Sequence, residues 1–282
     1  MIEILKYILL GLAQGVAEVL PISSSAHLEI MSQILNISDY SFTFKIFLHF
    51  ASLIATIFFL RKRLIFLIKG FFLYIFTKKE IDENGNVNTE KKDKYKYEFK
   101  YCIMIVIATI PAVIITLLLG DYIEGLSSIL WVIGILLIIN GISLFLFSLI
   151  KPRENQTMNY LDAIVIGTFQ CAGLFCGISR SGSCICGAMS RKLSKENVAD
   201  FVFLMLVPAV LGATVLSLKD IGQFMLNKNQ IHLYVISFVV TLVVTYFSFK
   251  ILMAVIKSSK FWVFSIYCIL MGAFALIYGL VK

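Results

Sequence analysis

Six apolar runs of about 20 residues dominate this sequence and limit the folds open to it. They lie at about 44–60, 99–119, 129–150, 198–218, 231–253 and 261–281. A helix of about 20 apolar residues is long enough to cross the hydrocarbon core of a bilayer. Hydrophobic residues make up 59% of the 282 positions and charged residues only 15%, so a soluble domain would lack the polar surface it needs. The sequence predicts an all-α polytopic membrane protein that forms a single integral membrane domain over 1–282.

Two further apolar segments, at about 2–35 and 160–193, are each interrupted midway by a helix breaker. They follow one template. Gln14 precedes Pro21 and a cluster of serines, and Gln170 precedes Gly177 and a second cluster at the same spacing. An interrupted span predicts a re-entrant helical hairpin, which a bilayer tolerates where the hairpin is buried in protein or faces a polar cavity. We therefore expect six transmembrane helices plus two re-entrant helical hairpins.

The loops between the spans carry an uneven distribution of Lys and Arg. Basic residues gather at 61–63 together with a Lys-rich loop at about 78–97, at 151–153, at 191–195 and at 257–260. The positive-inside rule places all four clusters on the cytoplasmic side. The first hairpin then enters from outside and the second from inside, which is an inverted-repeat arrangement with its site near the midplane. The net charge of +8 thus signals topology and does not indicate nucleic acid as a partner. The Lys-rich loop reads as solvated, with attraction to anionic lipid headgroups as the alternative.

Each break is followed by a serine at the expected start of a new helix. Ser23 is a candidate N-cap for a helix that begins near Ser24, and Ser179 is one for a helix that begins at Arg180. Two helix N-termini that converge within the membrane present free backbone N–H groups, and such a site suits phosphate. The guanidinium of Arg180 binds phosphate oxygens in a bidentate manner, which strengthens this interpretation.

Ionisable and hydroxyl groups near the first break suggest chemistry beyond binding. A carboxylate such as Glu18 beside a phosphate is repulsive unless it takes a proton, orients a base or holds a divalent cation. Ser24 and His27 are three residues apart on one helix face, a spacing suited to a nucleophile and its base. The pattern favours hydrolysis of a phosphoryl ester or anhydride, with Ser24, His27 or water left open as the nucleophile. The candidate catalytic residues are Glu18, Ser24, His27 and Arg180, and Glu18 is also the candidate metal ligand. The candidate substrate-binding residues are Gln14, Ser23, Ser25, Gln170, Ser179 and Ser181.

Structural roles compete with functional ones at several of these positions. Gln14 and Gln170 are equally suited to interhelical hydrogen bonding, and serines commonly pack helices in membranes. His49 and His232 lie at the edges of spans, so we expect them at the membrane interface. The cysteines match no zinc or redox spacing and read as packing residues. A soft-metal site is the alternative for four of them, Cys171, Cys176, Cys184 and Cys186.

The two break segments carry a resemblance to a known family. Residues 14–27 resemble the first motif of the undecaprenyl-diphosphate phosphatase family, also called the bacitracin-resistance family, and residues 176–184 resemble its second motif, P-G-x-S-R-S-x-x-T. The resemblance covers essentially the whole chain. It implies removal of the terminal phosphate from undecaprenyl diphosphate, which regenerates the lipid carrier for peptidoglycan and other envelope polymers. It further implies a pocket open to the outer face of the cytoplasmic membrane and a divalent cation, Mg²⁺ or Ca²⁺. Glu18 would then serve acid/base chemistry or metal binding, and Arg180 would hold the diphosphate with help from Ser179.

This chain departs from the family motifs at three positions. Cys176 replaces a proline, Cys184 replaces a threonine and Ala26 replaces a glycine. The loss of the threonine hydroxyl removes one potential phosphate contact, so a shifted lipid substrate stays open. The rival function is an inverted-repeat transporter or flippase for a phosphate-bearing lipid or small anion, which would share this architecture. Membrane lipids are expected partners in either case, and a homodimer is left open.

Overall fold

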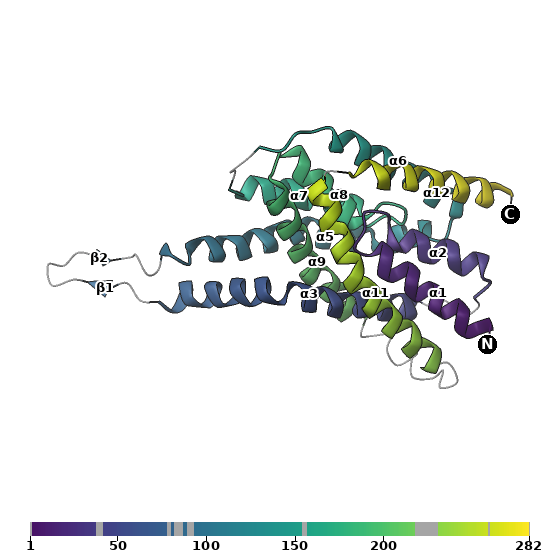
Figure 1. The fold of residues 1–282 in the computed structure, drawn as a ribbon, viewed down its shortest axis with the longest axis horizontal. Helices are drawn as coiled ribbons and strands as arrows, with labels where there is room; N and C mark the ends of the chain where they lie inside the picture. Colours follow the sequence, from purple (N-terminus) through teal and green to yellow (C-terminus); the bar gives the residue numbers. More distant parts are fainter. Residues whose placement is uncertain are drawn as a thin grey trace.

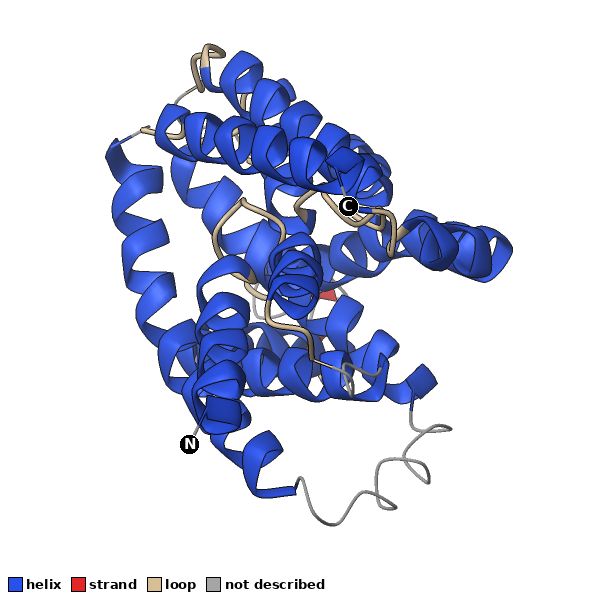
Figure 2. Cartoon of the chain, turned by 90° about the vertical axis from the view of Figure 1, so that its right-hand side faces the viewer, coloured by secondary structure: helices blue, strands red, loops and turns tan. Residues whose placement is uncertain are grey.

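The computed structural model describes residues 2–37, 42–77, 80–81, 87–88, 93–153, 157–217, 231–258 and 260–281. Within these residues the chain is almost entirely helical (Figure 2). The helices are α1 (Ile2–Ala17), α2 (Ser24–Ile34), α3 (Phe42–Phe76), α5 (Lys96–Leu126), α6 (Leu130–Ser148), α7 (Tyr160–Ala172), α8 (Arg180–Ser190), α9 (Lys195–Ser217), α11 (Ile231–Ser258) and α12 (Trp262–Val281). A short antiparallel pair, β1 (Glu80–Ile81) and β2 (Val87–Asn88), lies between α3 and α5 at one end of the molecule (Figure 1). Most of the predicted Lys-rich loop at 78–97 lies outside the described residues.

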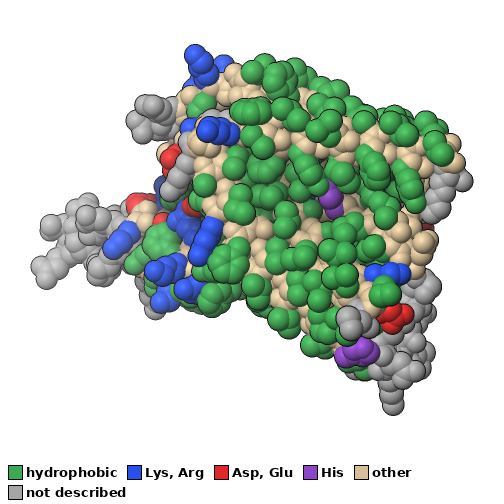
Figure 3. All heavy atoms as spheres, turned by 45° about the vertical axis from the view of Figure 1, so that its right-hand side comes forward, with side chains coloured by type: hydrophobic (Ala, Val, Ile, Leu, Met, Phe, Trp, Pro, Cys, Tyr) green, Lys and Arg blue, Asp and Glu red, His purple; other side chains and the backbone are tan. Residues whose placement is uncertain are grey.

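The predicted spans correspond to α3, α5, α6, α9, α11 and α12. Four of these helices, α5, α6, α11 and α12, are long and apolar enough to cross a membrane. Their outward faces carry large apolar side chains such as Leu118, which is 73% exposed, and Leu270, which is 66% exposed. Apolar side chains cover much of the surface in Figure 3, and Lys and Arg gather toward the end from which the β1–β2 segment projects. Such a surface is stable in lipid and unfavourable in water, so the chain is a multi-pass membrane protein.

Each of the two interrupted segments consists of two half-length helices. α1 ends at Ala17 and α2 begins at Ser24, whereas α7 ends at Ala172 and α8 begins at Arg180. The second half-helices, α2 and α8, are both 11 residues long and occupy equivalent positions of the sequence template. The breaks predicted from the sequence are therefore confirmed, and the repeat in sequence is also a repeat in local structure.

The packing of the helices is reciprocal between the two halves of the chain. The first half comprises α1, α2, α3, α5 and α6, and the second comprises α7, α8, α9, α11 and α12. α1, which begins the first half, packs on α11 of the second half. Its counterpart α7, which begins the second half, packs on α5 of the first half. α3 packs on its counterpart α9, and α6 packs on its counterpart α12. Each hairpin is thus held by a long helix from the opposite half.

Glycine at two equivalent positions allows the first helix of each hairpin to cross its partner closely. A Cβ atom at Gly11 of α1 would lie 2.7 Å from the carbonyl oxygen of Ser237 in α11. A Cβ atom at the equivalent Gly167 of α7 would lie 2.3 Å from the carbonyl oxygen of Ala108 in α5. Hydroxyls then bond across the first crossing, since Ser237 Oγ donates to the carbonyl of Tyr7 at 2.8 Å. Small residues and hydroxyls are the usual means of joining helices in a membrane, and here they fix both hairpins.

Candidate active site

The breaks of the two hairpins meet inside the molecule, and a residue from a third element joins them. Asn140 of α6 donates from Nδ2 to the carbonyl of Pro21 at 3.0 Å, and its Oδ1 accepts from the backbone N–H of Ser179 at 3.1 Å. The backbone N–H of Gly177 donates to Ser23 Oγ at 3.3 Å. Asn140 is 3% exposed and satisfies backbone groups that the breaks leave unpaired. Asn140 was not among the predicted site residues, although a lone amide in an apolar span can indicate such a role.

The two half-helices that follow the breaks begin differently. Ser179 caps α8 as predicted, because its Oγ accepts from the N–H of Gly182 at 3.1 Å. Ser23 precedes α2 with φ of 69°, and its hydroxyl forms no capping bond. That hydroxyl contacts Ser25 Oγ at 3.3 Å and accepts from Gly177. The cap prediction is therefore confirmed for Ser179 and wrong for the side chain of Ser23, whose hydroxyl is used to join the hairpins.

A cavity of about 90 Å³ lies between the two breaks. The predicted site residues that line it are Glu18, Ser23, Ser24, Ser25, Ser179 and Arg180. The other lining residues are Ala17, His49, Gly173, Leu174 and Ile178. The starts of α2 and α8 thus share one polar space, as expected for two converging helix N-termini, and this space is large enough for several water molecules or a phosphate group.

Arg180 brings a positive charge to the cavity. Its side chain forms no hydrogen bond or ion pair with any other residue that the structure describes. It acts on the carboxylate of Glu18 only through the electric field. A half-buried guanidinium inside a membrane protein is unfavourable unless an anion satisfies it. The cavity therefore favours an anionic ligand with oxygen acceptors.

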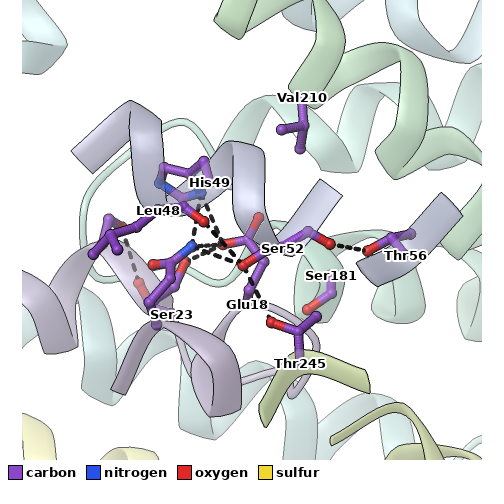
Figure 4. Close-up of polar contacts among 12 residues, drawn as sticks. Glu18, Ser23, Leu48, His49, Ser52, Thr56, Ser181, Val210 and Thr245 are labelled. Carbon is purple, nitrogen blue, oxygen red and sulfur yellow. Dashed lines mark hydrogen bonds and ion pairs between the residues drawn. The ribbon is translucent and has the colours of Figure 1, made fainter. Parts of the chain in front are cut away.

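Glu18 collects three donors on a single carboxylate oxygen, Oε2 (Figure 4). Ser24 Oγ donates to it at 2.6 Å, Gln14 Nε2 donates at 3.1 Å, and His49 Nδ1 lies 3.0 Å away. A distance of 2.6 Å is typical of a charge-assisted O–H···O⁻ bond. The hydroxyl of Ser24 therefore faces both the cavity and a carboxylate that can accept its proton.

His49, which the sequence did not predict as a site residue, turns its side chain into the cavity. Its side chain is 22% exposed, lines the cavity and pairs with Glu18. Along the same face of α3 follow Ser52 and Thr56, both buried. Ser52 Oγ accepts from Gln14 Nε2 at 3.4 Å, so this face of α3 supports the site. Three polar residues spaced three and four positions apart along an apolar helix indicate a polar face, but this face was not predicted from the sequence.

His27 points away from the cavity. Its Nδ1 lies 2.8 Å from the carbonyl of Ser23 and its Nε2 lies 2.7 Å from the hydroxyl of Tyr267, whose ring stacks on the imidazole at 5.5 Å. Because a carbonyl only accepts, Nδ1 carries the hydrogen and Nε2 accepts from Tyr267. No hydrogen bond joins His27 to Ser24 in the described part of the chain. The acceptor beside the Ser24 hydroxyl is Glu18, and the role predicted for His27 stays a prediction.

Two other predicted residues support the second break from outside the cavity lining. Gln170 is buried, and its Oε1 accepts from Cys184 Sγ at 3.8 Å. Ser181 Oγ lies 3.1 Å from Ser179 Oγ and donates to the carbonyl of Leu20 at 3.4 Å. The alternative soft-metal site finds no support, since no three His, Cys, Asp or Glu side chains among the described residues are grouped to hold a metal ion.

The structure is thus that of a membrane protein with a serine-lined internal cavity between two broken helices, into which Arg180 brings a positive charge. Residues 7–274 match the family described as "Bacitracin resistance protein BacA", and the chain belongs to that family. It is 36% identical over 276 residues to "Undecaprenyl-diphosphatase 2" of Bacillus thuringiensis (strain Al Hakam), covering 98% of this chain and 97% of the relative. It is 33% identical over 284 residues to "Undecaprenyl-diphosphatase" of Methanosphaera stadtmanae, covering 100% of both chains. A third relative, "Undecaprenyl-diphosphatase 1" of Shouchella clausii, is 31% identical over 281 residues, which cover 98% of this chain and 96% of the relative.

Proposed function

We propose that this protein is a membrane phosphatase that hydrolyses undecaprenyl diphosphate to undecaprenyl phosphate and inorganic phosphate. It thereby recycles the lipid carrier for synthesis of peptidoglycan and other envelope polymers. The relatives named undecaprenyl-diphosphatase cover nearly the whole chain. The observation that carries the proposal is the single cavity shared by Arg180 and by the hydrogen-bonded pair of Ser24 and Glu18.

The geometry supports a reaction in which Ser24 is the nucleophile. The terminal phosphate occupies the cavity, where Arg180 and the N–H groups at the start of α8 neutralise its charge. Ser24 Oγ attacks the terminal phosphorus as its proton passes to Glu18 Oε2. The bond from that phosphorus to the bridging oxygen breaks, and the lipid monophosphate leaves with the bridging oxygen. Water then attacks the phosphoserine, Glu18 relays the protons, and inorganic phosphate and free Ser24 result.

A divalent cation fits this site in one specific way. Glu18 is the single carboxylate among the lining residues that the structure describes. Magnesium commonly binds through one or two carboxylates together with substrate phosphates rather than in an all-protein cage. We propose that Glu18 would hold Mg²⁺ or Ca²⁺ jointly with the diphosphate, since its Oε1 accepts no hydrogen bond from any described residue. The cation would supply charge neutralisation on the diphosphate, so a chelator should lower phosphate release.

The membrane arrangement belongs to the same proposal. We infer six transmembrane helices and two re-entrant hairpins, α1–α2 and α7–α8, inserted from opposite faces of the cytoplasmic membrane. The equal lengths of α2 and α8 and the reciprocal packing of the two halves support an inverted repeat. The basic loops lie on the cytoplasmic side under the positive-inside rule, and the cavity opens toward the outer face. A homodimer is compatible with this arrangement.

Phosphate release in detergent tests the function, because vectorial transport cannot be registered there. The purified wild-type protein is expected to release phosphate from undecaprenyl diphosphate. The protein that combines Glu18→Ala, His27→Ala and Arg180→Ala is expected to release none. Undiminished release by this variant would refute the site. Binding of the lipid by the wild type without any release would favour the transporter or flippase.

A further inference from the structure

We propose that His49 is a positioning residue that holds the Glu18 carboxylate against the Ser24 hydroxyl. The inference rests on the proposed function and adds to it a residue that lies outside both break segments. His49 belongs to α3, whereas Glu18 and Ser24 belong to the first hairpin. Its Nδ1 lies 3.0 Å from Glu18 Oε2, the same oxygen that accepts from Ser24.

Glu18 needs such support because of its place in the chain. α1 ends at Ala17, so Glu18 is the first residue of the break, outside the regular helix. Its backbone N–H still bonds to the carbonyl of Gln14 at 3.0 Å and that of Leu20 to Val16 at 3.3 Å, but residues 18–22 form turns and not regular helix. Side-chain donors therefore determine where the carboxylate points. Gln14 supplies one of them from α1 of the same hairpin, and His49 supplies the other from a separate, 35-residue helix.

The contacts around the imidazole favour a hydrogen on Nδ1, because both hydrogens of the Gln14 amide have other acceptors, Glu18 Oε2 and Ser52 Oγ. One neighbour of Nδ1 is the Glu18 carboxylate, which can only accept, and the other is the amide nitrogen of Gln14, at 3.0 Å, which can only donate. A lone pair on Nδ1 would face the carboxylate, which favours the hydrogen there. Gln14 and His49 are then adjacent donors to one oxygen. At 3.0 Å the imidazolium forms an ion pair with the Glu18 carboxylate, and a neutral ring with its hydrogen on Nδ1 presents the same N–H to it.

A second layer fixes the face of α3 that carries His49. Ser52, one turn further along, donates to the carbonyl of Leu48 at 3.3 Å and accepts from Gln14 Nε2. Thr245 of α11 donates to Ser52 Oγ at 3.3 Å (Figure 4). The side chains of Ser52 and Thr245 are almost completely buried. Buried hydrogen-bonded hydroxyls thus hold in place the face of α3 that carries the imidazole. Such support is needed if His49 is to keep Glu18, the proposed proton acceptor, in position.

Three substitutions of His49 distinguish a role of its N–H donor from a role in packing alone. His49→Leu keeps the volume and removes the donor. His49→Asn places an amide nitrogen near the position of Nδ1, whereas His49→Gln places one near the position of Nε2. Each variant is purified, its Tm is measured in detergent, and its kcat and KM are measured on undecaprenyl diphosphate. His232→Leu is the control, because His232 is an exposed histidine at the start of α11.

We expect the loss in kcat to depend on whether the variant places an N–H donor near the position of Nδ1. His49→Leu lowers kcat by about 10- to 100-fold, the value of one hydrogen bond to a charged group, with little change in KM. His49→Asn restores kcat to within about 5-fold of wild type, and His49→Gln restores less. His232→Leu matches wild type.

Two results would overturn the inference alone. One is wild-type kcat in His49→Leu, and the other is a kcat in His49→Asn as low as that of His49→Leu when the Tm values agree. A wild-type protein that releases no phosphate from any prenyl diphosphate would instead overturn the proposed function.

Discussion

The two hairpins share a template in sequence and in helix length, yet they carry different chemistry. Glu18 stands in the first break where the second has Leu174, and Ser24 opens α2 where Arg180 opens α8. The first hairpin therefore supplies a hydroxyl and its proton acceptor, and the second supplies a fixed positive charge. The same helix–break–helix unit occurs twice, and both copies line one cavity. Because equivalent positions carry different side chains, the two copies contribute different chemical groups to that cavity.

The hairpins also differ in how their second helices begin. Ser179 caps α8 through Gly182, so that helix start is satisfied within its own segment. Ser23 adopts φ of 69° and bonds to Gly177 of the other hairpin. A left-handed conformation of a residue other than glycine is unfavourable by about 1–2 kcal/mol. The first break thus bonds to the second at this point, which links the proposed nucleophile to the hairpin proposed to bind the anion.

The strongest test of this division of roles is Ser24→Ala. We expect kcat to fall by at least about 1,000-fold with KM nearly unchanged, because the reacting hydroxyl is lost and the anion site is kept. Ser25→Ala is the matched control, since Ser25 lines the same cavity but its hydroxyl contacts Ser23. It should retain at least about one third of wild-type activity. Equal losses in the two variants would show that neither serine has a special role.

The complementary test in the second hairpin is Arg180→Ala. We expect KM to rise and kcat to fall, with about 100- to 1,000-fold lost from kcat/KM, because the charge on the diphosphate is no longer neutralised. Arg180→Lys should recover only part of this loss, since an ammonium lacks the bidentate fork. Arg153→Ala, at an exposed position, serves as the control. A purely kcat effect for Arg180→Ala would contradict its assignment to binding.

A third test breaks the packing that places the second hairpin. Gly167→Ala puts a methyl group 2.3 Å from a backbone oxygen of α5, so we expect a loss of about 2–3 kcal/mol in stability and a lower Tm in detergent. Gly11→Ala should have a smaller effect, because the nearest atom lies at 2.7 Å. Gly212→Ala, with no atom within 4 Å, should leave Tm unchanged. Equal Tm values for Gly167→Ala and Gly212→Ala would show that the crossing is not close.

The smallest expected effect concerns the helix starts. Ser179→Ala should lose about 1 kcal/mol of stability through the missing cap of α8. Ser23→Ala removes no cap but loses two long contacts, the bond from Gly177 and the one with Ser25 Oγ, so its loss should be about 0.5 kcal/mol. Thermal unfolding of both variants in the same detergent distinguishes the two. A larger loss for Ser23→Ala would mean that the joint between the hairpins outweighs the cap.

The features predicted correctly from the sequence are those set by local pattern. Apolar length determined the long helices, and the breakers at Pro21 and Gly177 determined where the hairpins are interrupted. The features that were missed depend on contacts between distant residues. Asn140 reaches Pro21 across 119 positions, and the ring of His27 is held by Tyr267 across 240. Spacing along one helix placed His27 near Ser24, but only tertiary packing decides which way the imidazole turns.

The most direct measurement of the central claim is the identity of the phosphorylated residue during turnover. Undecaprenyl diphosphate labelled at its terminal phosphate is mixed with the protein, the reaction is quenched in acid and in alkali, and the labelled peptides are mapped. The account predicts an acid-stable phosphate on Ser24 that is absent in Ser24→Ala and retained in Ser25→Ala. An acid-labile phosphate on His27, or full turnover by Ser24→Ala, would contradict it.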